Sequence, residues 1–402
     1  MIDNLPNGWK IEKLGNIGDI KAGGTPSRNK SEYWDGKIPW LKISDLKSKY
    51  IYNATEFITE EGLNNSSTKL FEKNTILYTI FATLGEVSIL KSEATTNQAI
   101  AGIKLKKTNI NLEYIYYYLL SIKEKIINIG RGVAQNNINL SILRDLNIPI
   151  PPLQQQEKIV KVFDLTSNLI EKQKELLEKY DLFLKSKFIE MFGDPITNPM
   201  GWENDVLSNV CPNKGDFVDG PFGSDLKVSD RTDEGIRIIQ INNVGENEFR
   251  DKNKAFIRQE KYLTLKRHEV LQNDIIIAKM GEPIARSCFL PKHIDKAIIV
   301  ADCMRMRITN NDYNRVFICF YLNFYTTKVL IDNLSHGSTR TRINLSILKT
   351  LEIIKPKVEL QNKFALIVEK IETIKEKENQ KLKQFEDLHN SMMNKAFKGE
   401  IK

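Results

Sequence analysis

An internal repeat of domain size is the feature of this sequence that leaves the fewest folds open. The pentapeptide Asn-Leu-Ser-Ile-Leu at residues 139–143 recurs at residues 344–348, an offset of 205 residues. The offset persists downstream, where Gln156 corresponds to Gln361, whereas upstream the similarity is weaker and the offset varies between 193 and 198 residues. A repeat of about 200 residues is too long for a solenoid unit and has the size of a domain. The sequence therefore predicts one architecture used twice, with front parts that have diverged.

Each repeat ends in a long amphipathic segment without internal glycine or proline, over about residues 154–190 and 358–397. Apolar residues recur there every three or four positions, which predicts a helix with a narrow stripe suited to a partner helix. Because equivalent helices of a pseudo-two-fold repeat meet symmetrically, we expect them to form an antiparallel coiled coil. The stripe residues are Ile159, Val162, Phe163, Leu169, Ile170, Leu176, Leu177 and Tyr180 in the first helix and Phe364, Ile367, Val368, Ile371, Ile374, Leu382 and Phe385 in the second.

The segments in front of the two helices are typical of mixed α/β structure. In the first, β-branched and aromatic runs such as residues 75–81 and 100–105 predict strands, and residues 112–129 predict a helix. In the second, residues 236–241 predict a strand and residues 316–330 a helix. We therefore expect an α+β fold in which two mixed α/β domains are separated by the two long helices. The expected divisions are residues 1–150, 151–193, 194–355 and 356–402.

Composition excludes some classes of protein and permits others. No apolar run approaches the 18 or so residues of a membrane span, and the N-terminus does not resemble a secretion signal. The net charge of +8 permits a polyanionic partner without requiring one. Residues 1–150 contain three arginines and residues 194–355 contain eleven, so the two variable segments present different chemistry.

The sequence contains no recognisable catalytic or metal-binding motif. Its four cysteines and four histidines are scattered and lack zinc-ligand spacing, which favours buried thiols in a reducing cytoplasm. The glycines of residues 18–24 resemble a phosphate loop but lack its lysine, and residues 198–201 lack the second proline and the aromatic residue of an amino-methyltransferase motif. We therefore expect a chain that recognises a partner and binds no metal or cofactor itself.

These features together resemble the specificity (S) subunit of type I restriction-modification systems. The resemblance covers essentially the whole chain, and only residues 354–360 depart from it, because they lack the double proline found before the first long helix. The segments that carry the resemblance are residues 8–10, 14–17, 23–27, 33–40, 139–160, 201–202 and 220–224.

This resemblance implies a function and a set of partners. Two target-recognition domains each read one part of a bipartite, asymmetric site on double-stranded DNA, while the conserved helices set the gap and dock two methyltransferase (M) subunits. Those subunits bind S-adenosylmethionine and methylate adenine. Two motor-nuclease (R) subunits, which use ATP and Mg²⁺, complete the restriction complex. The chain itself is expected to be a non-catalytic subunit.

Candidate DNA-binding residues lie in glycine-rich loops, before the two repeated pentapeptides, and at strand ends. Glycine permits close backbone approach to a phosphate, and Arg, Asn and Gln read bases in the major groove. The loop candidates are Thr25, Ser27, Arg28, Asn29, Lys30, Ser224 and Lys227; those before the pentapeptides are Arg131, Gln135, Asn136, Asn137, Ser338, Thr339, Arg340 and Arg342; those at strand ends are Gln240, Asn242, Asn243, Lys279 and Arg286. For all of them, an ordinary polar turn or cap is the alternative reading.

Two other functions stay open on the sequence alone. A coiled-coil interaction scaffold without a DNA role would share the long helices. A stand-alone DNA methyltransferase or nuclease is opposed by the missing cofactor and metal motifs.

Overall fold

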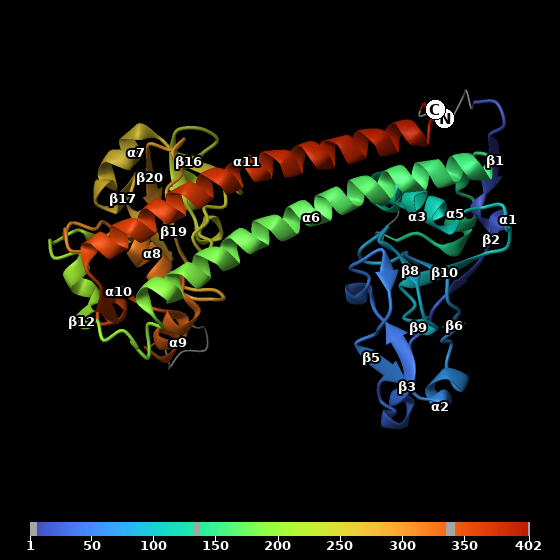
Figure 1. Cartoon of the computed structure of the whole chain (residues 1–402), viewed down its shortest axis with the longest axis horizontal. Coiled ribbons are helices and arrows are strands. Elements are labelled where there is room, and N and C mark those ends of the chain that lie inside the picture. The colour runs from blue at the N-terminus through green and yellow to red at the C-terminus, as the bar shows by residue number, and fades with distance from the viewer. Residues whose placement is uncertain (1–5, 132–136, 335–341, 401–402) are drawn as a thin grey trace. The chain divides into compact units, whose positions relative to one another are not determined.

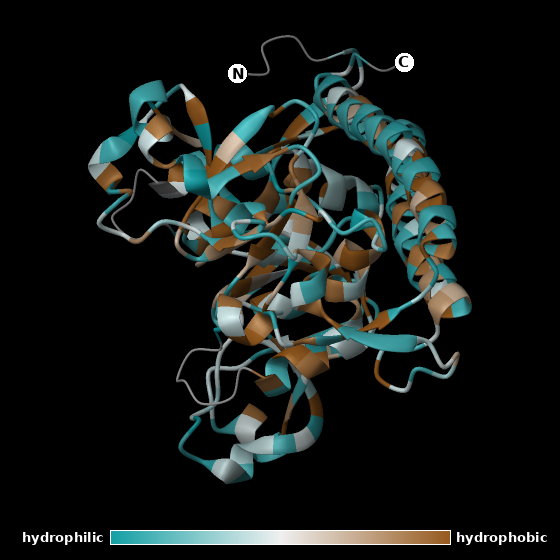
Figure 2. Cartoon of the chain, turned by 90° about the vertical axis from the view of Figure 1, so that its left-hand side faces the viewer, coloured by the Kyte–Doolittle hydropathy of each residue, from teal (hydrophilic) through white to brown (hydrophobic). Residues whose placement is uncertain are grey.

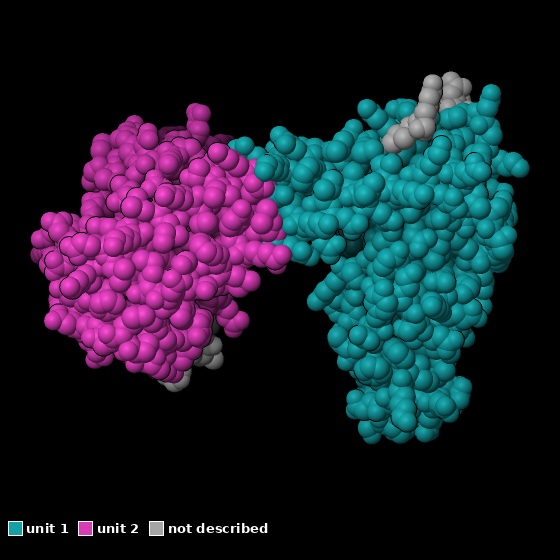
Figure 3. All heavy atoms as spheres, viewed as in Figure 1, with its two compact units in different colours: residues 1–175, 379–402 teal, residues 176–378 magenta. Residues whose placement is uncertain are grey.

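The computed structural model describes residues 6–131, 137–334 and 342–400, apart from the side chain of Arg131. The chain divides into two compact units, which are coloured separately in Figure 3. Unit 1 comprises Met1–Glu175 and Asn379–Lys402, and unit 2 comprises Leu176–Glu378. The long helices α6 (Leu153–Phe192) and α11 (Val358–Ala396) each begin in one unit and end in the other (Figure 1).

Unit 1 contains short strands and, besides the long helices, short helices. The strands are β1 (Lys10–Lys13), β2 (Gly18–Ala22), β3 (Trp34–Leu41), β4 (Tyr50–Ile51), β5 (Glu56–Ile58), β6 (Leu70–Phe71), β7 (Ile76–Thr79), β8 (Val87–Leu90), β9 (Ala94–Thr96), β10 (Ile100–Leu105) and β11 (Asn147–Ile150). The helices are α1 (Leu14–Ile17), α2 (Glu60–Asn64), α3 (Leu112–Ser121), α4 (Lys123–Arg131) and α5 (Leu140–Arg144), with 3₁₀ turns at Ser31–Tyr33 and Ile43–Asp45.

Unit 2 has the same kinds of elements in a similar order. The strands are β12 (Glu203–Val206), β13 (Phe217–Asp219), β14 (Arg231–Thr232), β15 (Ile236–Ile239), β16 (Ala255–Ile257), β17 (Glu269–Leu271), β18 (Ile275–Ala278), β19 (Ser287–Phe289), β20 (Lys296–Ile299), β21 (Cys303–Met306) and β22 (Glu352–Lys355). The helices are α7 (Gln259–Thr264), α8 (Arg315–Asn323), α9 (Tyr325–Leu334) and α10 (Leu345–Leu348), with 3₁₀ turns at Leu207–Val210, Val228–Asp230, Ile241–Asn243 and Lys266–His268.

The two units share one sheet plan. In unit 1 the sheet orders are β2-β10-β7-β8-β4 and β5-β3-β9-β6; in unit 2 they are β13-β21-β18-β19 and β14-β16-β15-β20-β17. The corresponding pairs β3·β9 and β15·β20 are both parallel, although most neighbouring strands are antiparallel. An antiparallel ribbon, β1·β11 or β12·β22, joins the start of each repeat to the residues just before its long helix. The predicted α+β class and internal repeat are therefore confirmed.

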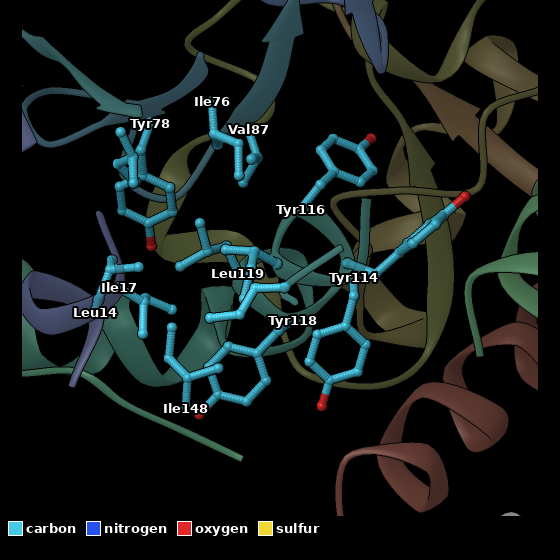
Figure 4. Packing of buried hydrophobic residues seen from close by; sticks show 14 of the residues in the cluster. Leu14, Ile17, Ile76, Tyr78, Val87, Tyr114, Tyr116, Tyr118, Leu119 and Ile148 are labelled. Carbon is cyan, nitrogen blue, oxygen red and sulfur yellow. The ribbon is translucent and has the colours of Figure 1, made fainter. Parts of the chain in front are cut away.

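Each unit builds its largest core around the start of one long helix and the end of the other. In unit 1, tyrosines of α3 pack with strand residues (Figure 4) and with Phe163 of α6 and Phe397, just after α11. In unit 2, Phe188 and Phe192 of α6 pack against α8 and against Phe364 of α11. Colouring by hydropathy shows hydrophobic segments along both long helices as well as within the sheets (Figure 2). The repeat therefore extends to how each long helix is anchored.

A buried glutamine anchors the start of each long helix in the same way. The Gln156 amide donates to the carbonyl oxygens of Pro151 at 2.8 Å and Asn109 at 3.2 Å, and it accepts from the Asn111 N–H at 2.8 Å. At the equivalent place in unit 2, the Gln361 amide donates to Pro356 and Asp312 and accepts from the Asn314 N–H. Both glutamine side chains are fully buried. Because Asn111 and Asn314 cap α3 and α8, the glutamine ties each long helix to a helix of its unit.

Within unit 1, α6 and the C-terminal part of α11 pair antiparallel. The Thr166 hydroxyl lies 2.6 Å from His389 Nδ1, and Lys174 forms a salt bridge with Glu386 at 3.2 Å. The pairing therefore includes polar side chains where the sequence suggested an apolar stripe alone.

Within unit 2, the C-terminal part of α6 pairs with the start of α11 in the same sense. Lys375 binds Asp181 at 2.7 Å, and its side chain is only 19% exposed. Burial alone would lower the pKa of Lys375, but hydrogen bonds to Asp181 and Glu372 outweigh it and raise the pKa. The antiparallel packing expected for the two long helices is confirmed in each unit.

The predicted stripe residues do not all lie in these pairings. Ile159, Phe163, Phe364 and Val368 are buried, and most others are half-buried. Leu169 and Ile374, in contrast, are 45% and 38% exposed in this chain. Leu169 follows the exposed Leu165 by one helical turn, so both lie on an outer face of α6. The apolar residues of the long helices thus lie on an exposed outer face as well as on the face that packs in the core.

Two predicted single helices are interrupted. The segment 112–129 divides into α3 and α4 at Ile122, and the segment 316–330 divides into α8 and α9 at Phe324. Phe324 has an extended backbone, and its ring stacks on Phe188 with centroids 4.9 Å apart. The break between α8 and α9 thus coincides with packing of Phe324 against α6. The apolar periodicity of residues 316–330 could not predict it, because Phe188 lies far away in the sequence.

Candidate nucleic-acid interface

The glycine-rich loop of unit 1 presents an exposed polar surface. Ser27, Arg28, Asn29 and Lys30 are exposed, whereas Thr25 is half-buried and donates to Gln98 at 2.5 Å. Gly24 has no room for a side chain, because an added Cβ would lie 2.5 Å from Ser67 Oγ and 2.6 Å from its backbone. Glycine at this position therefore lets the loop pack closely on residues 67–68.

Arg28 is held in a defined position by stacking. Its guanidinium lies 3.6 Å from the centre of the Trp34 ring and binds Glu56 at 2.6 Å. A hydrogen bond from Lys42 and a second from Arg28 hold the pKa of the Glu56 carboxyl below its ordinary value, although burial opposes this. The side chain of Arg28 is still 53% exposed, so a stacked, pre-oriented cation faces solvent.

In unit 2 the loop candidates are exposed, whereas the strand-end candidates include both exposed and buried side chains. Ser224, Lys227 and Asn242 are exposed. Asn243 is fully buried, and its amide donates to the carbonyl oxygens of Arg250 at 2.9 Å and Lys252 at 2.7 Å. Gln240 is half-buried, and its side-chain amide donates to the Asn253 carbonyl at 3.0 Å. Asn243 thus holds the local turn and does not face solvent.

The remaining strand-end candidates are cations with protein partners. Lys279 is 6% exposed and binds Asp219 at 2.6 Å. Arg286 is half-buried and donates to the carbonyl oxygens of Val244 at 3.1 Å and Pro283 at 2.9 Å. Burial, and then the neighbouring Arg250, lowers the pKa of Arg286.

The candidates before the repeated pentapeptides are only partly visible. Gln135, Asn136, Ser338, Thr339 and Arg340 lie outside the described residues, as does the side chain of Arg131, which ends α4. Asn137 is half-buried and has an interaction within the protein. Arg342 is exposed and lies 3.4 Å from a carboxylate oxygen of Asp302.

The structure brings two of these candidates together in a cleft of unit 2. Lys279 and Arg342 both line a cavity of about 740 Å³, beside the loop that contains Gly220 and Phe222. Four further basic side chains line it, which the sequence analysis did not single out: Lys214, Arg267, His268 and Lys349. The basic run Lys266–His268 is visible in the sequence, but nothing local indicates that it lies beside Lys349. The cleft is a candidate polyanion site.

All four cysteines are buried. Burial raises the pKa of the thiols of Cys211, Cys303 and Cys319 to about 12 and raises that of Cys288 well above its ordinary value. Over the described ranges, no group of three or more His, Cys, Asp or Glu side chains has the arrangement of a metal site. These thiols therefore pack as apolar groups near neutral pH.

Among the residues that the structure describes, no helix has the length and apolarity needed to cross a membrane.

A family model described as the type I restriction modification DNA specificity domain matches residues 6–179 and 224–384. The match covers both repeats and most of both long helices. The chain therefore belongs to the family of type I restriction-modification specificity subunits, and the resemblance inferred from the sequence is confirmed.

Individual relatives agree with this assignment. The MjaIX specificity subunit of Methanocaldococcus jannaschii is 36% identical over 60% of this chain and 57% of its own length. The EcoR124I/EcoR124II specificity subunit of Escherichia coli is 31% identical over 46% of this chain and 47% of its own length. These alignments span only about half of each relative. The MjaVIII specificity subunit of M. jannaschii is 23% identical over 99% of this chain and 94% of its own length.

Solved structures share the fold over nearly the full chain. A chain from a study of complex assembly in the type I restriction-modification system matches with a TM-score of 0.60 at 18% identity, covering 99% of this chain and 100% of that chain. The type I S subunit from M. genitalium matches with a TM-score of 0.52 at 17% identity, covering 98% of each chain. The likeness supports the α+β architecture with repeated domains and long helices.

Proposed function

We propose that this chain is the DNA sequence-recognition subunit of a type I restriction-modification complex and reads a bipartite, asymmetric site. The observation that supports this best is the occurrence of one sheet plan twice, with different polar side chains at equivalent positions. A repeated scaffold with diverged surfaces suits the reading of two different half-sites. Residues 1–150 and 194–355 are then the two target-recognition domains, and residues 151–193 and 356–402 are the conserved helices.

Exposed polar side chains of the two units are the preferred contacts. Arg28, Asn29 and Lys30 in unit 1 and Lys227 and Asn242 in unit 2 face solvent. Arginine recognises guanine and asparagine recognises adenine through paired hydrogen bonds in the major groove, while lysine neutralises phosphate. The buried Asn243 supports the turn that presents Asn242.

The long helices suit a spacer between half-sites. At a rise of about 1.5 Å per residue, the 40 residues of α6 span about 60 Å. One turn of DNA is about 34–36 Å long, so half-sites separated by more than one turn are expected. A footprint confined to one short continuous site would contradict this spacing.

The partners follow from the same proposal. Two M subunits, which carry S-adenosylmethionine, dock on the helices and methylate adenine, and two R subunits add ATP- and Mg²⁺-dependent restriction. The chain supplies recognition and is itself non-catalytic. Exposed apolar residues on the outer faces of the long helices, including Leu165 at 65%, Leu182 at 62% and Leu366 at 57%, suit such docking.

Methylome sequencing tests the proposal directly. The chain is co-expressed with its cognate M subunit in a host that lacks both, and modified bases are mapped across the genome. We expect a split motif with methylated adenine on both strands. No new methylation from a complex that is shown to be assembled and folded would favour an interaction scaffold without a DNA role.

A further inference from the structure

The basic cleft of unit 2 has an ion pair within its lining. Lys279 Nζ lies 2.6 Å from Asp219 Oδ1, and Asp219 also accepts at its backbone carbonyl from the ring of His268, 2.7 Å away. The Lys279 side chain is 8% exposed, whereas that of Asp219 is 40% exposed. Asp219 is the sole carboxylate among the described residues that line the cleft. The charge of Lys279 is thus balanced by Asp219. No carboxylate among the described lining residues is left to balance the other cations.

Three of those other cations lack an acidic partner. Within the described part of the chain, Lys214, Arg267 and Lys349 form no salt bridge, while Arg342 has a loose contact with Asp302 at 3.4 Å. Each comes from a different segment, so their convergence is a property of the fold. An excess of unpaired cations in one concave surface attracts a polyanion.

A buried arginine positions part of this lining. The guanidinium of Arg305, on β21, donates to the carbonyl oxygens of Asp216 at 3.2 Å and Arg267 at 3.3 Å. Arg305 is only 4% exposed. It therefore links the segment before β13 to the 3₁₀ turn that carries Arg267 and His268, and both segments contribute residues to the lining of the cleft.

Unit 1 has small residues at the positions of Asp219 and Arg305. Gly23 N–H binds the Ile100 carbonyl as Gly220 N–H binds that of Cys303, so Ala22 corresponds to Asp219. By the strand register, Gly102 pairs with Leu77 as Arg305 pairs with Ile276. The polar framework is therefore specific to unit 2.

The position of Lys279 shows the same difference between the units. The Lys279 N–H binds the Asp302 carbonyl, and the Lys279 carbonyl accepts from Ile343; Ile80 makes the equivalent bonds with Ala99 and Ile138. Ile80 is 2% exposed and belongs to the main core of unit 1. A buried lysine therefore replaces a core isoleucine, although a hydrophobic side chain satisfies the same scaffold. Burying the lysine charge costs desolvation free energy, which the ion pair with Asp219 offsets only in part, so packing alone does not account for Lys279.

We propose that this cleft binds the phosphodiester backbone of double-stranded DNA beside the half-site read by unit 2, and that the buried charged framework inside it has no counterpart in unit 1. Lys214, Arg267, Arg342 and Lys349 contact phosphates, while Lys279 and Asp219 set the potential inside the cleft. The inference rests on the proposed DNA-recognition function and adds to it the residues of unit 2 that contact the DNA backbone.

Salt-dependent binding of the full chain to a labelled mixed-sequence duplex tests the cleft. Binding weakens as salt rises, so the slope of log affinity against log salt is negative. We expect the double variant Arg267→Gln/Lys349→Gln to make this slope shallower by about 2, since each lost phosphate contact removes about 0.9. The matched control is Arg258→Gln/Lys292→Gln, which removes the same charge from exposed positions of unit 2 outside the cleft. The control is expected to keep the slope of the unmodified chain.

A third variant separates the role in binding from a loss of folding. Asp219→Asn removes the negative charge from the cleft, and we expect it to tighten DNA binding several-fold, which a destabilised protein would not do. If the unmodified chain binds DNA but the cleft variant matches its control and Asp219→Asn weakens binding or leaves it unchanged, the cleft assignment is wrong and the recognition function stands. If the folded, unmodified chain shows no salt-dependent binding, both are wrong.

Discussion

At the scale of single residues, equivalent positions of the two units have acquired different electrostatics. Lys123 in unit 1 forms a salt bridge with Glu86 at 2.7 Å. Lys328 follows Lys123 by the repeat offset, but the Glu86 position on the sheet is taken by Arg286, as the bonds from Thr79 to Glu86 and from Ala278 to Arg286 show. Lys328 is 6% exposed and donates to the Ile284 carbonyl at 3.1 Å. Burial lowers the pKa of Lys328 to about 7.

This shift predicts a pH dependence of stability. Between pH 7 and the ordinary pKa of lysine, the unfolded chain binds the proton that folded Lys328 has lost, so the free energy of unfolding rises with pH. We expect the unmodified chain to gain about 2 kcal/mol more than Lys328→Met between pH 7 and pH 9. Urea unfolding of both proteins at the two pH values measures the difference. Equal gains would show that Lys328 stays charged in the folded chain.

The candidate site could be predicted from the sequence only in part. Glycine next to polar residues identified the exposed loop of Arg28. The same reasoning selected Asn243, whose amide is used by backbone carbonyls, because residue type alone does not distinguish a turn-forming asparagine from one that faces a ligand. Lys214 and Lys349 were missed because only the tertiary structure places them in the lining of one cleft.

At the scale of elements, the junction between each long helix and its unit is a repeated device. Replacing Gln156 by Leu removes a side chain that satisfies the Pro151 carbonyl and the Asn111 N–H. We expect destabilisation by about 2–3 kcal/mol, because buried polar groups lose their partners. Hydrogen exchange should increase in α3. The matched variant Gln361→Leu should instead affect α8, and an identical exchange pattern in both variants would contradict two separate anchors.

The outer face of α6 gives a second prediction at this scale. Leu165 and Leu169 are 65% and 45% exposed on adjacent turns. If this face docks an M subunit, Leu165→Gln/Leu169→Gln should weaken the complex at least about tenfold, since two buried leucines typically contribute more than 1.4 kcal/mol. Binding of purified M subunit, measured by calorimetry, reports the change. Leu263→Gln, at a 60% exposed site on α7, is the control and should have no effect.

At the scale of the whole chain, the two units differ in the side chains at several equivalent positions and share the same arrangement of sheets and helix anchors. The sheet orders, the ribbons and the glutamine anchors recur, while the Ala22, Ile80 and Gly102 positions of unit 1 become Asp219, Lys279 and Arg305 in unit 2. A scaffold of this kind can change one recognition surface without disturbing the other, because each unit has its own core.

The repeat, the long helices and the family are readable from the amino-acid order, because periodicity and repeated motifs are local along the chain. The helix break at Phe324, the polar pair of Thr166 and His389, and the basic cleft emerge only in the folded protein. They depend on contacts between residues tens to hundreds of positions apart. In the folded protein, burial decides which charged or polar side chain needs an ion-pair partner, which forms hydrogen bonds within a turn and which faces solvent.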